Sequence, residues 1–158
     1  MMEPTSPLPS GVTLEPCTGA DFEALAALRL AAMRESLERL GRFDPERSRE
    51  RLQRSFYPEH TRIIVRAGER IGFYTLRPAP DGLHLEHFYV LPGHQSQGVG
   101  QAVMTQITAR ADVAQLPIFL GALKLSRSNA FYERHGFTVN AEGEWDLFYI
   151  RHPRAAGA

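Results

Sequence analysis

Hydrophobic and polar positions along the chain follow two different periods, and the changes between them mark the predicted elements. Short runs rich in β-branched and aromatic residues are typical of strands, and apolar residues that recur every three or four positions are typical of helices. Strands are predicted at Val12–Pro16, Thr61–Ala67, Ile71–Arg77, Leu83–Leu91, Leu116–Leu123, Phe137–Ala141 and Trp145–Arg151. Helices are predicted from Thr18 to about Leu40, from Asp44 to about Ser55, from Gly98 to about Asp112 and from Ser126 to His135. This order predicts an α/β fold in which antiparallel hairpins feed a central sheet.

Residues with known capping preferences support these boundaries. Thr18 and Asp21 have the spacing of a capping box at a helix start, and Asp44-Pro45 is a second start signal. Gly136 provides the left-handed residue that ends the last helix. Gly68-Glu69-Arg70 is predicted to join two of the strands as a hairpin.

The length of the chain fits one domain. A chain of 158 residues can bury most of the apolar surface that it exposes when unfolded. Residues 1–11 carry three prolines and are predicted to be a flexible leader. Residues 12–151 are predicted to form the domain, and residues 152–158 a tail.

Composition narrows the class of partner. The formal net charge is zero, so no overall charge attracts nucleic acid or an anionic membrane. The single cysteine, Cys17, excludes an internal disulfide and a multi-cysteine metal site, which suits a reducing cytoplasm. We expect a cytoplasmic protein without nucleic-acid or membrane partners, in which Cys17 is a small buried residue.

The segment from Leu83 to Met104 has the pattern of a strand, a glycine-bearing turn and the start of a helix. Its turn contains the spacing Gln95-x-x-Gly98-x-Gly100. Free amides at a helix start bind phosphate, and glycines allow the phosphate to approach closely. The same spacing also occurs in turns that bind nothing. A P-loop would need a lysine after the glycines, and a dinucleotide motif would need a third glycine where Val103 stands.

The longer pattern Val90-x-Pro92 followed by Gln95-x-x-Gly98-x-Gly100 resembles the acyl-CoA pyrophosphate loop of the GNAT acetyltransferase superfamily. Residues Ser126–Phe137 resemble the second signature region of that superfamily, a short helix that carries a tyrosine and ends in Gly-Phe. The resemblance implies a single-domain GNAT fold from Val12 to Arg151. That fold has a mixed, mostly antiparallel sheet, helices on both faces, and fourth and fifth strands that splay apart.

The resemblance further implies acetyl-CoA as co-substrate. No metal is expected, because His84 and Glu86 have no third ligand at a supporting spacing. The amides of residues 97–101 would bind the pyrophosphate, the backbone of residues 88–90 would pair with pantetheine, and Asn129 would hydrogen-bond the pantetheine arm. The implied cofactor-binding set is Phe88, Tyr89, Val90, Gln95, Ser96, Gln97, Gly98, Val99, Gly100, Gln101, Asn129 and Tyr132. Asn129 is equally well explained as a polar residue in the first turn of a helix.

The loop departs from the family pattern at two positions. Arginine is usual where Gln95 stands, and glycine is usual where Ser96 stands. Gln95 removes one positive charge near the pyrophosphate, so that binding would depend more on amides and on other cations. Lys124 and Arg127 are candidates for contact with the adenosine phosphate.

Acyl transfer from a thioester to an amine needs a base and an acid. The amine attacks only when neutral, so a base must remove its proton, and the departing thiolate needs a proton in return. Tyr132 matches the family position of the acid, with aromatic packing beside Gly136 as the alternative. Glu86 and His84 are candidates for the base, and bulk water or structural roles for both side chains remain open. His87 is expected on the opposite face of the strand as a core histidine.

The acceptor is expected to be the primary amine of a small molecule or a peptide. Candidate acceptor contacts lie in the first two helices and the last hairpin: Arg34, Glu35, Phe43, Phe56, Tyr57, Trp145, Asp146 and Tyr149. Two alternatives are a non-catalytic acyl-CoA-binding domain and a domain of this fold that binds another ligand. A homodimer is a further possibility.

Overall fold

The computed structural model describes residues 8–155, so the first seven residues of the predicted leader and the last three of the predicted tail lie outside it. The described chain divides into two compact units. The N-terminal unit contains Leu8–Leu76 and Glu86–Gly100, and the C-terminal unit contains Arg77–Leu85 and the chain from Gln101 onward. Each unit is described by itself below.

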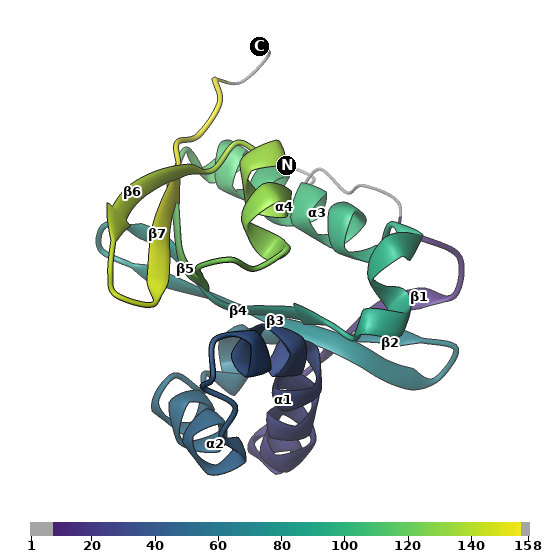
Figure 1. Cartoon of the computed structure of the whole chain (residues 1–158). Helices are drawn as coiled ribbons and strands as arrows, with labels where there is room; N and C mark the ends of the chain where they lie inside the picture. Colours follow the sequence, from purple (N-terminus) through teal and green to yellow (C-terminus); the bar gives the residue numbers. More distant parts are fainter. Residues whose placement is uncertain (1–7, 156–158) are drawn as a thin grey trace. The chain divides into compact units, whose positions relative to one another are not determined.

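The N-terminal unit contains two long helices and the first strands. Its elements are β1 (Val12–Pro16), η1 (Gly19–Asp21), α1 (Phe22–Arg39), α2 (Pro45–Arg54), η2 (Pro58–His60), β2 (Thr61–Arg66), most of β3 (Glu69–Ala79) and the second half of β4 (Gly82–Val90). β1 pairs with β2 and β2 pairs with β3, both antiparallel. Figure 1 shows α1 and α2 side by side against these strands.

The core of the N-terminal unit lies between the two helices and the sheet. Leu25 of α1, Leu52 of α2 and Phe73 of β3 have no exposed surface. The remaining members of this cluster are Cys17, Leu28, Ile63 and Val65, with Phe22, Ala26, Phe56, Tyr89 and Leu91 packed against them. Because Tyr89 and Leu91 belong to the end of β4 and the residue after it, this core holds that segment in place.

The predicted caps at Thr18 and Asp44 are confirmed, whereas Ser126, expected to cap the last helix, lies one residue before its N-cap, Arg127. Thr18 and Asp21 form the capping box, in which the Thr18 amide donates to Asp21 Oδ2 at 2.9 Å. The Asp44 side chain accepts a hydrogen bond from the Arg47 amide at 3.2 Å at the start of α2. The β2–β3 hairpin turns at Ala67 and Gly68, both with positive φ, as in a type I′ turn.

The C-terminal unit contains the remaining strands and two helices. Its elements are the start of β4, most of α3 (Val99–Ala114), β5 (Ile118–Leu123), α4 (Ser128–Arg134), β6 (Thr138–Glu142) and β7 (Asp146–Arg151). β5 pairs antiparallel with β7, and β7 pairs antiparallel with β6. β4 and β5 are parallel, with pairing at Leu83↔Ile118 and His84↔Phe119, near the N-terminal ends of both strands. An ion pair joins β7 to α3, because the buried Arg151 donates to both carboxylate oxygens of the half-buried Asp112 at 2.8 and 3.1 Å.

Most element boundaries differ from the prediction by one or two residues, and Glu69 and Arg70, predicted to lie in the hairpin turn, belong to β3. Two of the differences have a clear physical reason. Leu116 was expected to begin a strand, but its amide donates to the Ala111 carbonyl and closes the end of α3, so that β5 begins at Ile118. Residues Pro92–Gln97 were expected to be a turn and instead form a 3₁₀ helix, η3. Pro92 favours a helical start because its fixed φ suits that position and its missing N–H is not needed there.

The seven strands of the described residues form a sheet in the order β1-β2-β3-β4-β5-β7-β6. The predicted α/β class, with a mixed and mostly antiparallel sheet, is confirmed. In residues 8–155 no helix has the length and apolar content needed to cross a bilayer.

Candidate functional site

The loop that follows β4 ends at the start of α3. η3 covers Pro92–Gln97, and Gly98 then adopts a left-handed conformation with φ of 78° before α3 begins at Val99. Val99 has no exposed surface, so its side chain anchors the helix start in the core. The first amides of an α-helix lack intrahelical acceptors, and this end of the helix attracts anions. The predicted loop therefore has the backbone required of an anion site.

Two glutamines of the loop contact neighbouring strands. Gln95 donates from Nε2 to the Val90 carbonyl at 2.8 Å, which ties the loop back to β4. The Gln97 side-chain oxygen accepts a hydrogen bond from Arg66, the last residue of β2. Sequence analysis missed Arg66, because nothing in its local sequence distinguishes it. This contact brings a cation to a loop in which arginine is replaced by Gln95.

The end of β4 alternates between two environments. His87 is buried and Tyr89 packs on the α1–α2 core, so these two side chains share the face covered by the helices. Glu86 and Phe88 are half-buried, and the alternation of a strand directs them to the other face. The prediction that His87 is a core histidine is confirmed. Burial, together with the nearby charge of Arg29, lowers the pKa of His87 to about 4.

His84 lies in the C-terminal unit with partners of its own. Its Nε2 is 2.8 Å from Asp81 Oδ1, and its ring stacks on Phe119 with centroids 5.1 Å apart. The hydrogen bond from His84 holds the pKa of Asp81 below its usual range. His84 thus has the carboxylate partner that orients a histidine, but Asp81 is exposed and belongs to a turn.

Asn129 lies in the first turn of α4, as the structural alternative predicted. Its Oδ1 accepts a hydrogen bond from the Ser126 amide at 3.1 Å, and Ser126 Oγ accepts one from the Ser128 amide at 3.2 Å. These two bonds hold the turn that precedes α4, whose N-cap residue is Arg127. The other end of the Asn129 amide, Nδ2, is buried and has no hydrogen-bond partner in the described part of the chain. The bond to the Ser126 amide therefore fixes the side chain, and Nδ2 is a buried donor near Tyr149.

Tyr132 is held by aromatic neighbours within the C-terminal unit. It is 6% exposed, and its ring lies 5.8 Å from Phe137 and 6.0 Å from Tyr149 between centroids. Gly136 ends the helix with φ of 90°, and the Phe137 amide returns to the Tyr132 carbonyl at 3.1 Å. This geometry fits Tyr132 as an aromatic packing residue. It also fits Tyr132 as the acid, because tight packing fixes the position of its hydroxyl.

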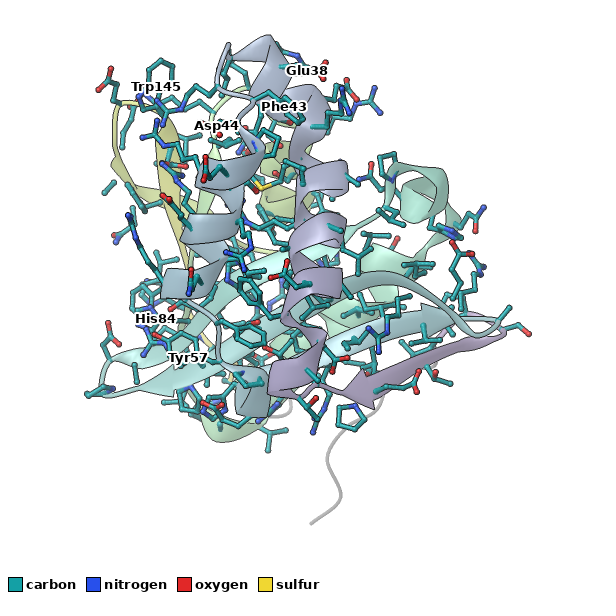
Figure 2. All side chains as sticks on the ribbon, turned by 90° about the horizontal axis from the view of Figure 1, so that it is seen from below. Glu38, Phe43, Asp44, Tyr57, His84 and Trp145 are labelled. Carbon is teal, nitrogen blue, oxygen red and sulfur yellow. The ribbon has the colours of Figure 1, made fainter. Side chains whose placement is uncertain are left out.

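Several of the candidate acceptor residues already contact neighbouring side chains. Arg34 pairs with Glu38 at 2.6 Å and lies over the Phe43 ring. Figure 2 shows Glu38, Phe43 and Asp44 gathered where α1 ends and α2 begins. Phe56 packs edge-on against the Phe22 ring in the core.

Tyr149 is also a poor candidate for acceptor contact. It is 1% exposed, and its hydroxyl has no hydrogen-bond partner among the described residues. Burial raises the pKa of Tyr149, the charge of Glu133 raises it further, and the nearby Asn129 side chain acts in the opposite direction. Tyr149 therefore stays a neutral phenol inside the C-terminal unit.

Two other candidates have structural partners. Cys17 is buried, and burial together with the charge of Asp21 raises the pKa of its thiol to about 11, so the thiol stays protonated. This agrees with the small buried residue that was predicted. Lys124, a candidate for phosphate contact, pairs with Glu142 at 2.7 Å.

Sequence analysis also missed a buried polar network in the N-terminal unit. Arg29 of α1 is 6% exposed and donates from Nε to Tyr89 Oη at 3.2 Å. Its Nη1 donates to Ser48 Oγ at 2.5 Å and to the Ser48 carbonyl at 3.3 Å. His87 continues the network, with Nδ1 3.4 Å from Tyr89 Oη and Nε2 2.9 Å from Ser55 Oγ. No local pattern predicts these contacts, which join residues far apart in the sequence.

Each unit thus contains one part of the predicted site. The N-terminal unit holds Glu86, the backbone of residues 88–90 and the loop as far as Gly100. The C-terminal unit holds His84, Gln101, Asn129 and Tyr132.

The chain has the fold of several solved structures, among them two proteins named as N-acetyltransferases. The chain resembles PaiA N-acetyltransferase from Thermoplasma acidophilum, solved in complex with coenzyme A, with a TM-score of 0.64 and 16% identity over 89% of this chain and 98% of that one. It also resembles the ribosomal-protein-S18-alanine N-acetyltransferase from Escherichia coli, with a TM-score of 0.68 and 17% identity over 92% of this chain and 96% of that one. Ard1 from Thermoplasma volcanium gives a TM-score of 0.67 at 16% identity, over 91% and 99% of the two chains. At these identities the likeness establishes the fold.

The sequence itself matches a family model described as an acetyltransferase (GNAT) domain. The match covers residues 58–139, which is just over half of the 158-residue chain. It contains the loop after β4 and the helix that carries Tyr132. The chain therefore belongs to the GNAT acetyltransferase family.

Proposed function

We propose that this protein transfers an acetyl group from acetyl-CoA to a primary amine of a small molecule or peptide, by direct attack in a ternary complex. Membership of the family supports acetyl transfer in general. Direct attack is preferred to an acyl-enzyme because the only cysteine, Cys17, is buried and protonated.

The observation that carries this proposal is the loop after β4. Gly98 turns the chain through a left-handed conformation directly before α3, which leaves the first amides of the helix available for the pyrophosphate of acetyl-CoA. Arg66, held against Gln97, supplies positive charge beside the loop. The unused buried donor Asn129 Nδ2 supports a hydrogen bond to a carbonyl of the pantetheine arm.

We assign the proton transfers to two side chains. Tyr132 protonates the departing thiolate, for which a phenol has a well-matched pKa. Glu86 removes the proton of the amine, directly or through a water molecule. Glu86 is preferred to His84 because it is half-buried on β4, two residues before the backbone that is proposed to pair with pantetheine.

Release of the CoA thiol tests the proposal. Purified protein is mixed with acetyl-CoA and a panel of amines, amino acids and peptides, and free thiol is measured over time. Thiol release that depends on an amine supports acetyl transfer. If acetyl-CoA raises the melting temperature but no amine stimulates release, the protein is a non-catalytic acyl-CoA-binding domain. If acetyl-CoA has no effect on melting even at high concentration, both functions are wrong.

A further inference from the structure

Arg66 places a guanidinium group at the loop that follows β4. Its Nη1 donates to Gln97 Oε1, and Gln97 is the last residue of η3, directly before the left-handed Gly98. Gln97 and Gly98 are exposed and Arg66 is half-buried, so this contact lies at the surface of the N-terminal unit. The oxygen of the Gln97 side chain is neutral. The hydrogen bond therefore holds the guanidinium at the loop without neutralising its charge.

The backbone also connects the β2–β3 hairpin to the start of the loop. The amide of Leu91, the residue directly before η3, donates to the Ile71 carbonyl of β3 at 2.8 Å. Ile71 is the extra residue of a β-bulge, where the register of β2 against β3 shifts by one residue. The end of the hairpin that carries Arg66 is thus joined to the loop at two points, once through the backbone and once through Gln97.

The side chain of Arg66 is directed to the face of the sheet opposite to α1 and α2. Ile63 and Val65 of β2 belong to the core under these helices, so alternation along the strand directs Arg66 to the other face. Glu86 and Phe88 of β4 are directed to the same face by the same rule. Arg66 is therefore on the side of the sheet that carries the proposed base.

The charge of Arg66 is not neutralised within residues 8–155. Glu69 lies opposite Arg66 in the hairpin, but it is exposed and forms no ion pair with Arg66 in this part of the chain. The other arginine at this end of the hairpin, Arg70, is paired with Asp21 at 2.9 Å. Of these two arginines, Arg66 is the one whose charge remains for a ligand.

We propose that Arg66 binds the diphosphate of acetyl-CoA, so that the cation of this site comes from β2 and not from the loop. Residues 92–98 contain no lysine or arginine, and Gln95 uses its Nε2 to hold the Val90 carbonyl. A guanidinium suits the role because its fork of N–H donors matches phosphate oxygens and its charge is permanent. The identity of the anion rests on the proposed use of acetyl-CoA.

Calorimetric titration with coenzyme A and with dephospho-coenzyme A tests this assignment without turnover. Dephospho-coenzyme A keeps the diphosphate and lacks the 3′-phosphate, so the pair distinguishes the two sources of negative charge. Arg66→Gln should bind both ligands about 10-fold more weakly than the wild type at low salt, the lower end of the range for a hydrogen bond to a charged group. The difference should shrink as salt is added, because ions screen an exposed charge.

Two further variants assign the effect to the position of the charge. Arg62 is an exposed arginine of the same strand, about 13 Å from Arg66, so Arg62→Gln should bind both ligands as the wild type does. Arg66→Gln combined with Gln95→Arg should recover most of the lost affinity, because the second substitution returns a guanidinium to the site from the loop. Thermal melts check that each variant is folded.

Three results would overturn the proposal. Wild-type affinity of Arg66→Gln for both ligands means that the guanidinium does not contact the cofactor. Weaker binding of coenzyme A alone, with dephospho-coenzyme A unchanged, means that the anion at Arg66 is the 3′-phosphate. Absence of binding of either ligand by the wild type, which needs no variant to fold, removes the acyl-CoA site altogether. Failure of acetyl transfer itself is detected separately, by the absence of thiol release.

Discussion

At the scale of single residues, Tyr132 depends on its neighbours for its position. Its ring is packed between Phe137 and Tyr149, so loss of the hydroxyl alone should leave that packing intact. We predict that Tyr132→Phe lowers turnover by about 100-fold or more, because a general acid contributes on that order. Affinity for coenzyme A, measured by calorimetry, should change little. Turnover equal to that of the wild type would remove Tyr132 from the acid role.

Glu86 offers a second test at this scale. Glu86→Gln keeps the shape of the side chain but cannot accept the proton of the amine. We expect a lower rate and a shift of the limb of the pH–rate profile that rises with pH, because that limb reports the base. An unaltered profile would direct attention to His84, whose ring is already paired with Asp81, or to bulk water.

Gly98 can be tested by substitution, with Gly93 of the same loop as the control. Gly98 has φ of 78°, a conformation that costs any residue with a Cβ about 1–2 kcal/mol, whereas Gly93 is not in that region and has open space around it. We predict that Gly98→Ala weakens binding of acetyl-CoA and that Gly93→Ala does not. Equal affinities of the two variants, measured by calorimetry, would contradict the proposed role of the loop.

Residue roles could be predicted only where a local pattern carries them. The spacing of Gln95, Gly98 and Gly100 indicated the loop, and Gly136 indicated the end of α4. The inward direction of His87 followed from strand alternation. Arg29 could not be found in this way, because its partners Ser48 and Tyr89 are 19 and 60 positions away.

At the scale of elements, β3 and β4 approach each other closely at Gly72. A Cβ built at this position would lie 2.1 Å from the carbonyl oxygen of Tyr89, and backbone atoms cannot yield as a flexible side chain can. We predict that Gly72→Ala destabilises the protein by about 3 kcal/mol, the upper end of the usual cost of overpacking. This corresponds to a loss of roughly 6–12 °C in melting temperature.

Gly121 is the control for this prediction. A Cβ at Gly121 of β5 would lie 3.3 Å from ring atoms of Phe148, a side chain that is 44% exposed and has room to move. Thermal melts should therefore show little change for Gly121→Ala. A Gly72→Ala variant as stable as the wild type would mean that the two strands separate at small cost.

Element types were predictable because each has a period and a cap. The boundaries of elements were less predictable where one residue can either end one element or begin the next. Leu116 continues an apolar run in the sequence, yet its amide is used to end α3. η3 was missed because a short 3₁₀ helix has no hydrophobic period, and only Pro92 and Gly98 mark its ends.

At the scale of the whole molecule, His87 links stability to pH. Its pKa is about 4 in the folded protein, below the usual 6.5, because it is buried. Between these values the unfolded chain binds a proton that the folded protein does not bind, so stability falls as pH is lowered from 6.5 toward 4. The loss due to His87 is at most about 3 kcal/mol.

Melting temperatures across this pH range test the effect. His87→Gln should reduce the dependence on pH, whatever its stability near pH 7. His152→Gln, which alters an exposed histidine, should follow the wild type. A His87→Gln curve parallel to that of the wild type would mean that other groups cause the acid sensitivity.

The fold class and the family were accessible from the sequence, because two motifs in the expected order point to the same superfamily and the family model covers both. The buried network around Arg29 was not accessible, because its residues are brought together by folding. Arg29, Ser48 and Tyr89 come from three separate elements, and their shared position depends on how α1 and α2 pack on the sheet.

Amine-dependent release of the CoA thiol is the most direct test of acetyl transfer by this protein. Wild-type protein and Tyr132→Phe are compared with acetyl-CoA and the same amine panel, and the products are checked by mass spectrometry for one added acetyl group. We predict release and an acetylated amine with the wild type, and much slower release with Tyr132→Phe. Binding of acetyl-CoA without any acetylated product across the panel would contradict acetyl transfer.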